Sequence, residues 1–302
     1  MPELPEVETI IRDLQKKIIG RKIKNVWTDF PKMIKKPKSF KDFKKGVKNK
    51  KIQRVWRRAK NIIFELSNNY SLLIHQKMTG HLLFGKWKAK NGKWISSVPG
   101  PLQSDPMNRF LHLIFFLDNG QQLALSDLRK FAKVELWKTK ELENDEEMKK
   151  LGPEPLEKDF TLEKFKEVLR MKKADRGEPR QRRGKIKQIL MDQTIIAGIG
   201  NIYSDEILWR AKIHPFKDIS KLSNQELKKI YKITRGLLLL AIKLGGESIS
   251  DYRRPSGEKG YYDKERKVYR KEGEKCSVCN GIIKRVKMSG RSAHFCPACQ
   301  KL

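Results

Sequence analysis

The stretch CSVCNGIIKRVKMSGRSAHFCPAC, residues 276–299, holds all four cysteines of the chain as two Cys-x2-Cys pairs separated by 16 residues. Each pair places two thiolates on one tight turn, and two such turns supply the tetrahedral sulfur set of a structural zinc site. A pair of disulfides is the alternative, but it is disfavoured in a reducing compartment. His294 offers a substitute ligand, although the sulfur set is complete without it. The predicted zinc ligands are Cys276, Cys279, Cys296 and Cys299.

The chain also carries a large excess of basic residues. Its 302 residues include 68 Lys and Arg against 35 Asp and Glu, a formal net charge of +33. Self-repulsion of this size opposes compaction unless a polyanion neutralises part of it. A generic solvated surface or adaptation to salt or heat is the alternative. Because basic tracts such as 32–51 and 166–187 recur along the chain, we favour an extended nucleic-acid-binding face.

The sequence shows neither a membrane-spanning segment nor a secretory signal. No apolar run reaches the length that spans a bilayer, and the segment 237–244 is interpreted as a buried helix. The acidic start, MPELPEVETI, lacks the basic-then-apolar order of a secretory signal. We therefore expect a cytoplasmic protein, associated with the nucleoid if the cell is prokaryotic.

The first half of the chain predicts an antiparallel β-sandwich preceded by a helix. Apolar residues at helical spacing fill 3–18, and Gly20 ends that helix. Short extended runs then follow one another with turn signals between them, and no long helix intervenes. The predicted strands are 62–66, 71–76, 81–87, 110–117, 122–127 and 133–137. The segment 89–108 is predicted to be a long loop.

The second half is predicted to be helical and then to end in the cysteine-rich hairpin. Helices are expected at 161–172, 184–192, 201–211 and 223–244. The predicted fold class is thus α+β multidomain, with a β-sandwich domain at 1–150 and a helical domain at 151–250. A loop and the zinc ribbon would occupy 251–302.

A glycine turn precedes one predicted helix in QTIIAGIGNIYSDEIL at 193–208. Gly198 and Gly200 permit close backbone approach, and the free amides of a helix start attract phosphate. Asn201 is suited to cap that helix and to donate to a phosphate oxygen. An ordinary interhelical turn is the alternative. No parallel strand precedes the turn, so a dinucleotide site is not expected.

Several separated motifs together resemble those of the formamidopyrimidine-DNA glycosylase family. They occur in the family's order and cover almost the whole chain. The motifs are MPELPEVETI, RRAKN around Lys60, DLRKF at 127–131, QTIIAGIGNIYSDE, GGESISDY, SGEKGYY and GRSAHFCPACQ.

The resemblance implies that Met1 is removed and that the secondary amine of Pro2 is the nucleophile. An amine that attacks C1′ forms an iminium and splits base loss and strand cleavage into easier steps. The resemblance also implies that Glu3 moves protons at the sugar and that Glu6 supports the site. Without the other motifs, PELPEVE would read as an ordinary helix start, because proline and acids both suit that position.

The resemblance further implies a set of DNA contacts. Lys60 and Arg291 would contact phosphates and serve as proton donors for β- and δ-elimination, respectively. An enzyme that acts on a base takes the base out of the duplex and fills the gap. The family fills it with side chains that match Met78, Arg129 and Phe131, although Met78 and Phe131 alone would read as sandwich core. The predicted DNA-binding residues are Lys60, His75, Met78, Arg129, Phe131, Asn201 and Arg291.

The implied activity is that of a base-excision-repair glycosylase and lyase for oxidised purines in double-stranded DNA. The loop 248–262 would cover the flipped base, and the protein is expected to act as a monomer. Two alternatives stay open at this point. One is an endonuclease VIII-like glycosylase for oxidised pyrimidines, and the other is a non-catalytic nucleic-acid-binding module.

Overall fold

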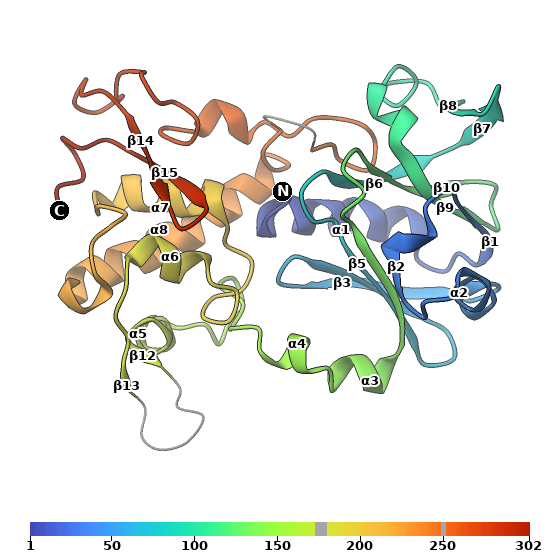
Figure 1. Ribbon diagram of the computed structural model, residues 1–302, viewed down its shortest axis with the longest axis horizontal. Helices are drawn as coiled ribbons and strands as arrows, with labels where there is room; N and C mark the ends of the chain where they lie inside the picture. The colour runs from blue at the N-terminus through green and yellow to red at the C-terminus, as the bar shows by residue number, and fades with distance from the viewer. Residues whose placement is uncertain (173–179, 249–251) are drawn as a thin grey trace. The chain divides into compact units, whose positions relative to one another are not determined.

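The computed structural model describes residues 1–172, 180–248 and 252–302 (Figure 1). Parts of the basic tract 166–187 and of the loop 248–262 therefore lie outside the described residues. The chain forms two compact units. Unit 1 comprises Met1–Lys149 and Ile242–Asp263, and unit 2 comprises Lys150–Ala241 and Lys264–Leu302.

Unit 1 begins with a helix and continues with two β-sheets. Its helices are α1 (Leu4–Ile18), α2 (Phe40–Val47), α3 (Thr139–Glu143) and α4 (Glu146–Lys149), with short 3-10 helices η1 (Pro31–Met33) and η2 (Pro106–Phe110). Its strands are β1 (Ile23–Thr28), β2 (Ile34–Lys36), β3 (Ile52–Arg58), β4 (Asn61–Leu66), β5 (Tyr70–His75), β6 (Gly80–Gly85), β7 (Trp87–Lys90), β8 (Lys93–Ser96), β9 (Leu111–Leu117), β10 (Gln122–Asp127) and β11 (Lys133–Lys138).

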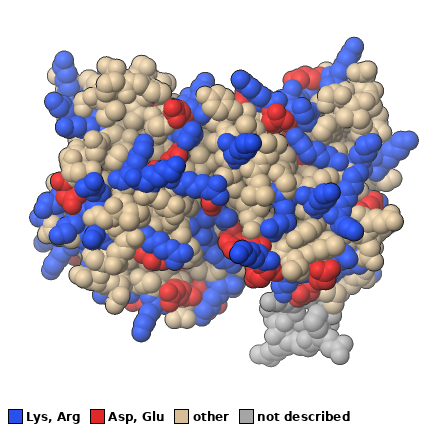
Figure 2. Space-filling model, turned by 180° about the vertical axis from the view of Figure 1, so that it is seen from behind, with Lys and Arg blue, Asp and Glu red and all other residues tan. Residues whose placement is uncertain are grey.

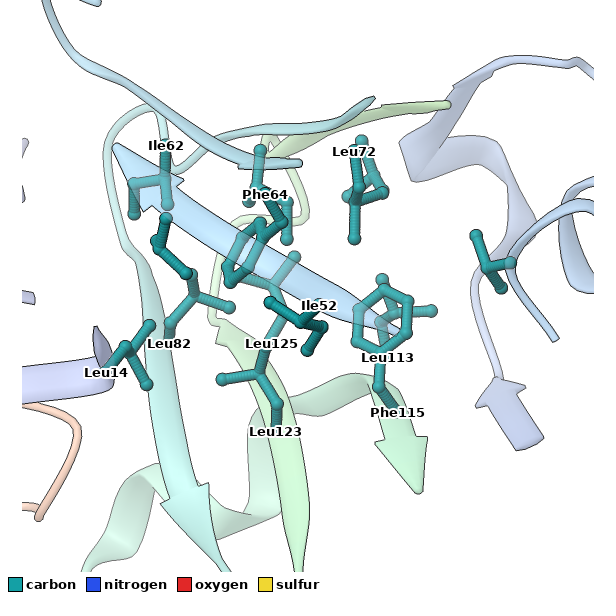
Figure 3. Close-up of a cluster of buried hydrophobic side chains, with 14 of the residues drawn as sticks. Leu14, Ile52, Ile62, Phe64, Leu72, Leu82, Leu113, Phe115, Leu123 and Leu125 are labelled. Atoms are coloured by element: carbon teal, nitrogen blue, oxygen red, sulfur yellow. The ribbon is translucent and has the colours of Figure 1, made fainter. Parts of the chain in front are cut away.

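The two larger sheets pack around one core, as predicted for a sandwich. One sheet has the order β1-β9-β10-β6 and the other has the order β2-β11-β5-β4-β3. Apolar side chains from both sheets meet in one buried cluster, which the apolar face of α1 joins through Leu14 (Figure 3). The sheets are antiparallel except that β2 runs parallel to β11. Burial of this cluster is the main contribution to the stability of unit 1.

Strand β9 is apolar on both faces because each face is covered. Leu113 and Phe115 point into the main core, whereas Ile114 belongs to a second cluster with Trp87 and Leu102. The prediction of a long loop at 89–108 was wrong, because this segment contains part of the hairpin β7–β8 and the start of η2. The hairpin forms because Asn91 and Gly92 both adopt positive φ and turn the chain.

Unit 2 is mainly helical and ends in a β-hairpin. Its helices are α5 (Leu162–Arg170), α6 (Ile186–Met191) and α7 (Asn201–Ala211), with most of α8 (Asn224–Lys243) and the 3-10 helix η3 (Ile219–Lys221). The 3-10 helix η4 (Tyr262–Glu265) begins in unit 1 and ends in unit 2. The strands of unit 2 are β12 (Met171–Lys172), β13 (Arg180–Gln181), β14 (Lys284–Met288) and β15 (Arg291–Phe295).

The segment 237–244 was predicted to be a buried helix, and this is only half right. It lies mostly in α8, but Leu239 and Leu240 are exposed, because a helix packed on one side leaves its other face in solvent. In the described part of the chain, no helix combines the length and the apolar character needed to cross a membrane. Lys and Arg side chains are spread over the face shown in Figure 2 and are not gathered in one tail.

Candidate active site

The N-terminal segment enters unit 1 as a buried, hydrogen-bonded structure. Pro2 and Glu3 are both buried immediately before α1, whose first residue is Leu4. The backbone N–H of Glu3 donates to Glu6 Oε2 at 2.8 Å, and the two glutamates form a reciprocal capping box. Because this bond is made by the peptide that follows Pro2, it fixes the position of the proline ring.

Glu6 also links the helix start to a distant part of unit 1. Its other oxygen, Oε1, accepts a hydrogen bond of 2.8 Å from the backbone N–H of Glu247. Gly246 adopts a φ of +86°, and a Cβ there would lie 3.0 Å from Glu6 Oε1. The loop after α8 therefore packs directly on the carboxylate that holds the N-terminus.

Lys60 lies in the turn between β3 and β4, after Ala59, which adopts a φ of +53°. Its side chain is buried, with the residue only 6% exposed. Considered alone, a lysine in so basic a chain would be expected on the surface. Burial of an ammonium group is costly unless the group is paired, so this position is not one of generic surface charge.

His75 ends β5 beside this turn, opposite Asn61 of β4. Burial and the charges of Lys77, Lys60 and Lys133 lower the pKa of His75 from 6.5 to about 3. The imidazole is therefore neutral at physiological pH. Its Nδ1 accepts a hydrogen bond of 3.0 Å from the backbone N–H of Lys77, which assigns the proton to Nε2. That N–H is a donor suited to an anion such as a phosphate oxygen.

Met78 and Phe131 are exposed and are not part of the sandwich core. Met78 is 41% exposed on the β5–β6 loop, and Phe131 is 52% exposed on the β10–β11 loop. The guanidinium carbon of Arg129 lies 4.5 Å from the centre of the Phe131 ring. Two apolar tips and a cation thus stand on neighbouring loops, which suits an apolar wedge and an arginine that can reach a base.

A buried carboxylate that the sequence reasoning missed holds these loops together. Asp127 is fully buried and accepts hydrogen bonds from the Thr79 hydroxyl at 2.5 Å and from the Ala132 N–H at 2.7 Å. The Arg129 N–H donates to Asp127 at 3.2 Å and to Thr79 at 3.1 Å. The only signal available was the first residue of DLRKF, whose role a single sequence does not reveal.

In unit 2, the glycine turn is shaped by a side chain that was not singled out. Gln193 donates to the carbonyl of Ile199 at 2.7 Å and accepts from the N–H of Gly198 at 2.9 Å. Helix α7 then starts at Asn201, but its N-cap is Gly200, which corrects the expectation that Asn201 caps the helix. Asn201 Oδ1 is buried without a hydrogen-bond partner among the described residues.

Asn201 borders a polar hollow of about 480 Å³, whose wall includes Arg270, Arg285 and Ser292. Arg270 and Arg285 favour an anion here, although Glu272 lines the same hollow and pairs with Arg285 at 3.3 Å. Arg291 does not line this hollow. It is exposed at the start of β15 and borders a separate hollow of about 210 Å³ with Gln188 and Ser289. Unit 2 therefore presents its two predicted phosphate-binding residues at two adjacent places.

The four cysteines form one cluster that fits a metal ion. Their sulfur atoms all lie within 4.8 Å of one another, and no disulfide joins them. A tetrahedral site with zinc–sulfur bonds of about 2.3 Å has sulfur atoms separated by roughly 3.8 Å. The separations are 3.8 Å between Cys276 and Cys299, 3.4 Å between Cys279 and Cys296 and 3.2 Å between Cys279 and Cys299, so the sulfur atoms are as close as that geometry needs or slightly closer. Four protein ligands leave no position for a reacting water.

The ribbon is attached to the helices of unit 2 by two buried acids of α7. Asp205 pairs with Lys187 at 2.5 Å and accepts from the His294 N–H at 3.0 Å. His294 Nδ1 lies 2.9 Å from the same carboxylate, so this histidine holds the hairpin and is not part of the cysteine cluster. Glu206 accepts three backbone N–H bonds from residues 267–269. Neither acid was predicted.

Family models and relatives agree with this arrangement. The formamidopyrimidine-DNA glycosylase N-terminal domain matches residues 1–134, its H2TH domain matches 151–253, and the zinc finger found in FPG and IleRS matches 273–302. The formamidopyrimidine-DNA glycosylases of Pelotomaculum thermopropionicum and of Lactococcus lactis subsp. cremoris are 39% and 38% identical to this chain over 302 residues, covering 100% of both proteins in each case.

Solved structures extend the likeness to three dimensions. The Lactococcus lactis Fpg in complex with DNA containing an abasic site is 37% identical with a TM-score of 0.84, covering 99% of this chain and 100% of that one. MutM in complex with DNA containing carbocyclic 8-oxo-G is 37% identical with a TM-score of 0.83 and full coverage of both chains. Fold and site define a helix–two-turn–helix DNA glycosylase with a four-cysteine ribbon. The chain belongs to the formamidopyrimidine-DNA glycosylase family.

Proposed function

We propose that this protein excises oxidised purines, such as 8-oxoguanine and formamidopyrimidines, from double-stranded DNA and then cleaves the strand at the abasic site. The observation that carries the proposal is the buried Pro2–Glu3 segment, held by Glu6 at the start of α1. The match to formamidopyrimidine-DNA glycosylases over the full chain supports the same reaction. It also favours oxidised purines over the pyrimidine substrates of the endonuclease VIII branch.

The reaction requires that Met1 be removed, because an amide nitrogen cannot form an iminium. The Pro2 amine attacks C1′ as the bond from C1′ to the base breaks, and the base departs with a proton. Glu3 then gives a proton to the ring oxygen O4′, which opens the sugar and leaves an iminium between Pro2 and C1′. An unperturbed α-amine has a pKa near about 8, so a useful fraction is unprotonated at neutral pH.

Strand cleavage follows from the iminium. Loss of a proton at C2′ expels the 3′ phosphate, and a second elimination expels the 5′ phosphate; water then releases the sugar fragment from Pro2. We assign proton donation in the first elimination to Lys60 and in the second to Arg291, in addition to their contacts with phosphates. His75 and Asn201 are assigned to phosphate contacts, because each presents a polar atom suited to an anion or to a bound water.

Met78, Arg129 and Phe131 are assigned to the gap left by the extruded nucleotide. Their exposure supports this, since an apolar side chain that props open a base step must reach beyond the protein surface. The loops that carry them are fixed by Asp127, so the wedge is presented in one position. Arg129 would bond to the base left without a partner.

We further propose that the cysteine cluster binds one zinc ion, which shapes the hairpin 284–295 and takes no part in the chemistry. Metal analysis of the purified protein should find one zinc per chain. The protein would act as a monomer on chromosomal DNA in the cytoplasm. A binding domain at 151–250 between a catalytic domain at 1–150 and a ribbon segment at 251–302 is the proposed division of labour.

Borohydride trapping tests the proposed function. The protein is mixed with a duplex that has one 8-oxoguanine opposite cytosine and is treated with sodium borohydride. Reduction of the iminium should give a stable adduct that maps to the N-terminal peptide, and intact mass should show that Met1 is absent. A matched form that retains Met1 should bind the duplex without forming an adduct. Binding without any adduct would leave only the non-catalytic alternative.

A parallel arm separates the two glycosylase branches. A duplex with dihydrouracil in place of 8-oxoguanine is treated in the same way. Faster trapping on 8-oxoguanine supports the proposed function, whereas faster trapping on dihydrouracil would assign the protein to the pyrimidine branch.

A further inference from the structure

The described loop 252–260 in unit 1 contains two consecutive arginines that pair with acids from different segments. Arg254 forms a two-point ion pair with Asp13 of α1, through Nε at 2.9 Å and Nη2 at 2.8 Å. Arg253 lies 3.8 Å from Asp105, which precedes η2. Fork-shaped pairing of guanidinium and carboxylate fixes orientation as well as distance. The loop is thus attached to the catalytic helix on one side and to the segment 97–110 on the other.

Both of these ion pairs are partly buried, as are the Arg57–Glu8 and Lys133–Glu135 pairs elsewhere in unit 1. The Arg253 and Asp105 side chains are 15% and 4% exposed, and those of Arg254 and Asp13 are 29% and 19% exposed. The Arg54–Glu65 pair on the sheet, in contrast, has exposed fractions of 64% and 31%. Ion pairs at the surface contribute little to stability, whereas shielded pairs with several hydrogen bonds hold a definite geometry.

Backbone contacts place the same loop against the sandwich. The N–H of Phe84 on β6 donates to the carbonyl of Pro255 at 2.8 Å. Gly257 adopts a φ of +84°, and a Cβ there would lie 2.8 Å from the side chain of Leu102 and 3.0 Å from its backbone nitrogen. Leu102 is itself buried in the second cluster of unit 1. The segment 97–110 therefore supports the loop through Leu102, which is held in the second cluster.

At its other end the loop reaches the N-terminal site. The Tyr252 hydroxyl lies 3.4 Å from the Glu6 carbonyl, and Glu247, shortly before the loop, donates to the Glu6 carboxylate. A loop anchored here and at Asp13 runs along the helix whose start carries Pro2. Loops usually belong to the least stable parts of a protein. The two ion pairs and the close packing at Gly257 therefore hold this loop more firmly than is usual for a loop.

We propose that Arg253 and Arg254 are positioning residues that hold loop 252–260 in place for recognition of the extruded base, with Asp13, Asp105 and Leu102 as their fixed supports. The inference rests on the proposed function, because it assigns the loop to the base and not to the sugar. A preformed loop avoids the cost of ordering on binding. Excision of a damaged base therefore depends on the arginines, whereas cleavage at a site that has already lost its base does not.

The test compares two substrates across a small set of variants. Arg254→Met removes the guanidinium, Arg254→Lys keeps the charge without the two-point geometry, and Asp13→Asn weakens the same pair from the helix side. Arg54→Met is the matched control, since it removes the same charge from an exposed pair. Single-turnover rates are measured on a duplex with 8-oxoguanine and on a duplex with a preformed abasic site.

We expect Arg254→Met to slow excision of 8-oxoguanine by about tenfold to a hundredfold, the range that follows from misplacing a contact near the reacting group. The excision rate of Arg254→Lys should lie between the rates of Arg254→Met and the wild type. The rate on abasic DNA should stay within about threefold of the wild type in all variants. Arg253→Met and Asp105→Asn should show the same selectivity, and Arg54→Met should change neither rate.

A double variant tests whether Arg254 acts through its ion pair with Asp13. Asp13→Asn combined with Arg254→Met should be no slower than Arg254→Met alone, because both changes remove one interaction. Equal losses on the two substrates would show a general structural role and overturn the proposal. Unchanged excision in Arg254→Met would overturn it as well.

Amide hydrogen exchange measures how firmly the arginines hold loop 252–260, and it does not depend on catalysis. Amides of the peptide 252–262 should exchange faster in Arg254→Met than in the wild type and in Arg54→Met. Unchanged exchange would show that the arginine does not order the loop. If the wild type itself forms no borohydride adduct, the proposed function fails, and the exchange result still decides whether the arginines hold the loop.

Discussion

Asp127 in unit 1 and Asp205 in unit 2 are both fully buried carboxylates, yet they are stabilised in different ways. Asp127 accepts from a hydroxyl and two backbone amides, and it connects two loops. Asp205 forms an ion pair with Lys187 and also binds His294, and it connects helices to the ribbon. In a chain with a net charge of +33, buried acids are thus used as anchors. Asp127 holds two loops together through neutral hydrogen-bond donors alone, whereas Asp205 joins helices to the ribbon through a buried ion pair.

Asp205→Asn should have the largest effect on stability, because it leaves the Lys187 ammonium buried beside a neutral group. Breaking a buried ion pair from one side costs about 3–5 kcal/mol. Urea unfolding monitored in unit 2 should show this loss. Asp192→Asn is the control, because Asp192 is exposed in the turn between α6 and α7, the helix that carries Asp205. It should change the free energy of unfolding by less than about 0.5 kcal/mol. A similar small change in Asp205→Asn would remove the distinction between the two anchors.

Asp127→Asn should destabilise the protein less, by about 1–3 kcal/mol, since the amide keeps one acceptor oxygen and leaves no cation unpaired. Its effect on excision should exceed its effect on stability, because the loops that carry Met78 and Phe131 lose their fixed position. Unfolding in urea and single-turnover excision are the two measurements. Asp118→Asn, in an exposed turn of the same sheet, is the control. A loss of stability larger than that of Asp205→Asn would contradict the comparison.

The smallest effect concerns pH. Burial and nearby lysines lower the pKa of His75 to about 3 from 6.5, so the unfolded chain binds a proton that the folded protein does not. The neutral imidazole therefore contributes stability that is present above about pH 6.5 and is lost as the pH falls toward 3. His75→Gln should show a shallower loss of unfolding free energy than the wild type between about pH 7 and pH 5. Equal slopes would show that His75 titrates normally.

The six predicted strands and the main helices are found within one or two residues of their expected bounds, because periodicity and turn residues are local signals. The hairpin β7–β8 was missed because each of its strands has only four residues, which is too short for a clear alternating pattern. The parallel pairing of β2 with β11 was also missed, because it joins strands about a hundred residues apart and leaves no local pattern. Asn201 was expected to cap α7, but the helix starts one residue earlier than such a cap would require, with Gly200 as its N-cap.

The candidate site was predictable where chemistry depends on residue type and spacing. Four cysteines in two pairs indicate a metal site whatever surrounds them, and the four sulfur atoms do meet. The motif order likewise identified the family. The roles of individual residues at the DNA stay proposals, since no feature of one sequence separates a phosphate-binding lysine from the many others in so basic a chain.

The sequence by itself determined the cluster of four cysteines, the helix that follows Pro2 and the family. Only the tertiary structure decided which side chains are exposed and which are anchored. Met78 and Phe131 stand out from the surface, whereas Lys60 is buried, the reverse of what their polarity suggests. Glu6 reaches Glu247, and Asp13 reaches Arg254, across 241 residues in each case. Such contacts depend on how remote elements pack, and the free energy that selects them is not encoded in any local window of residues.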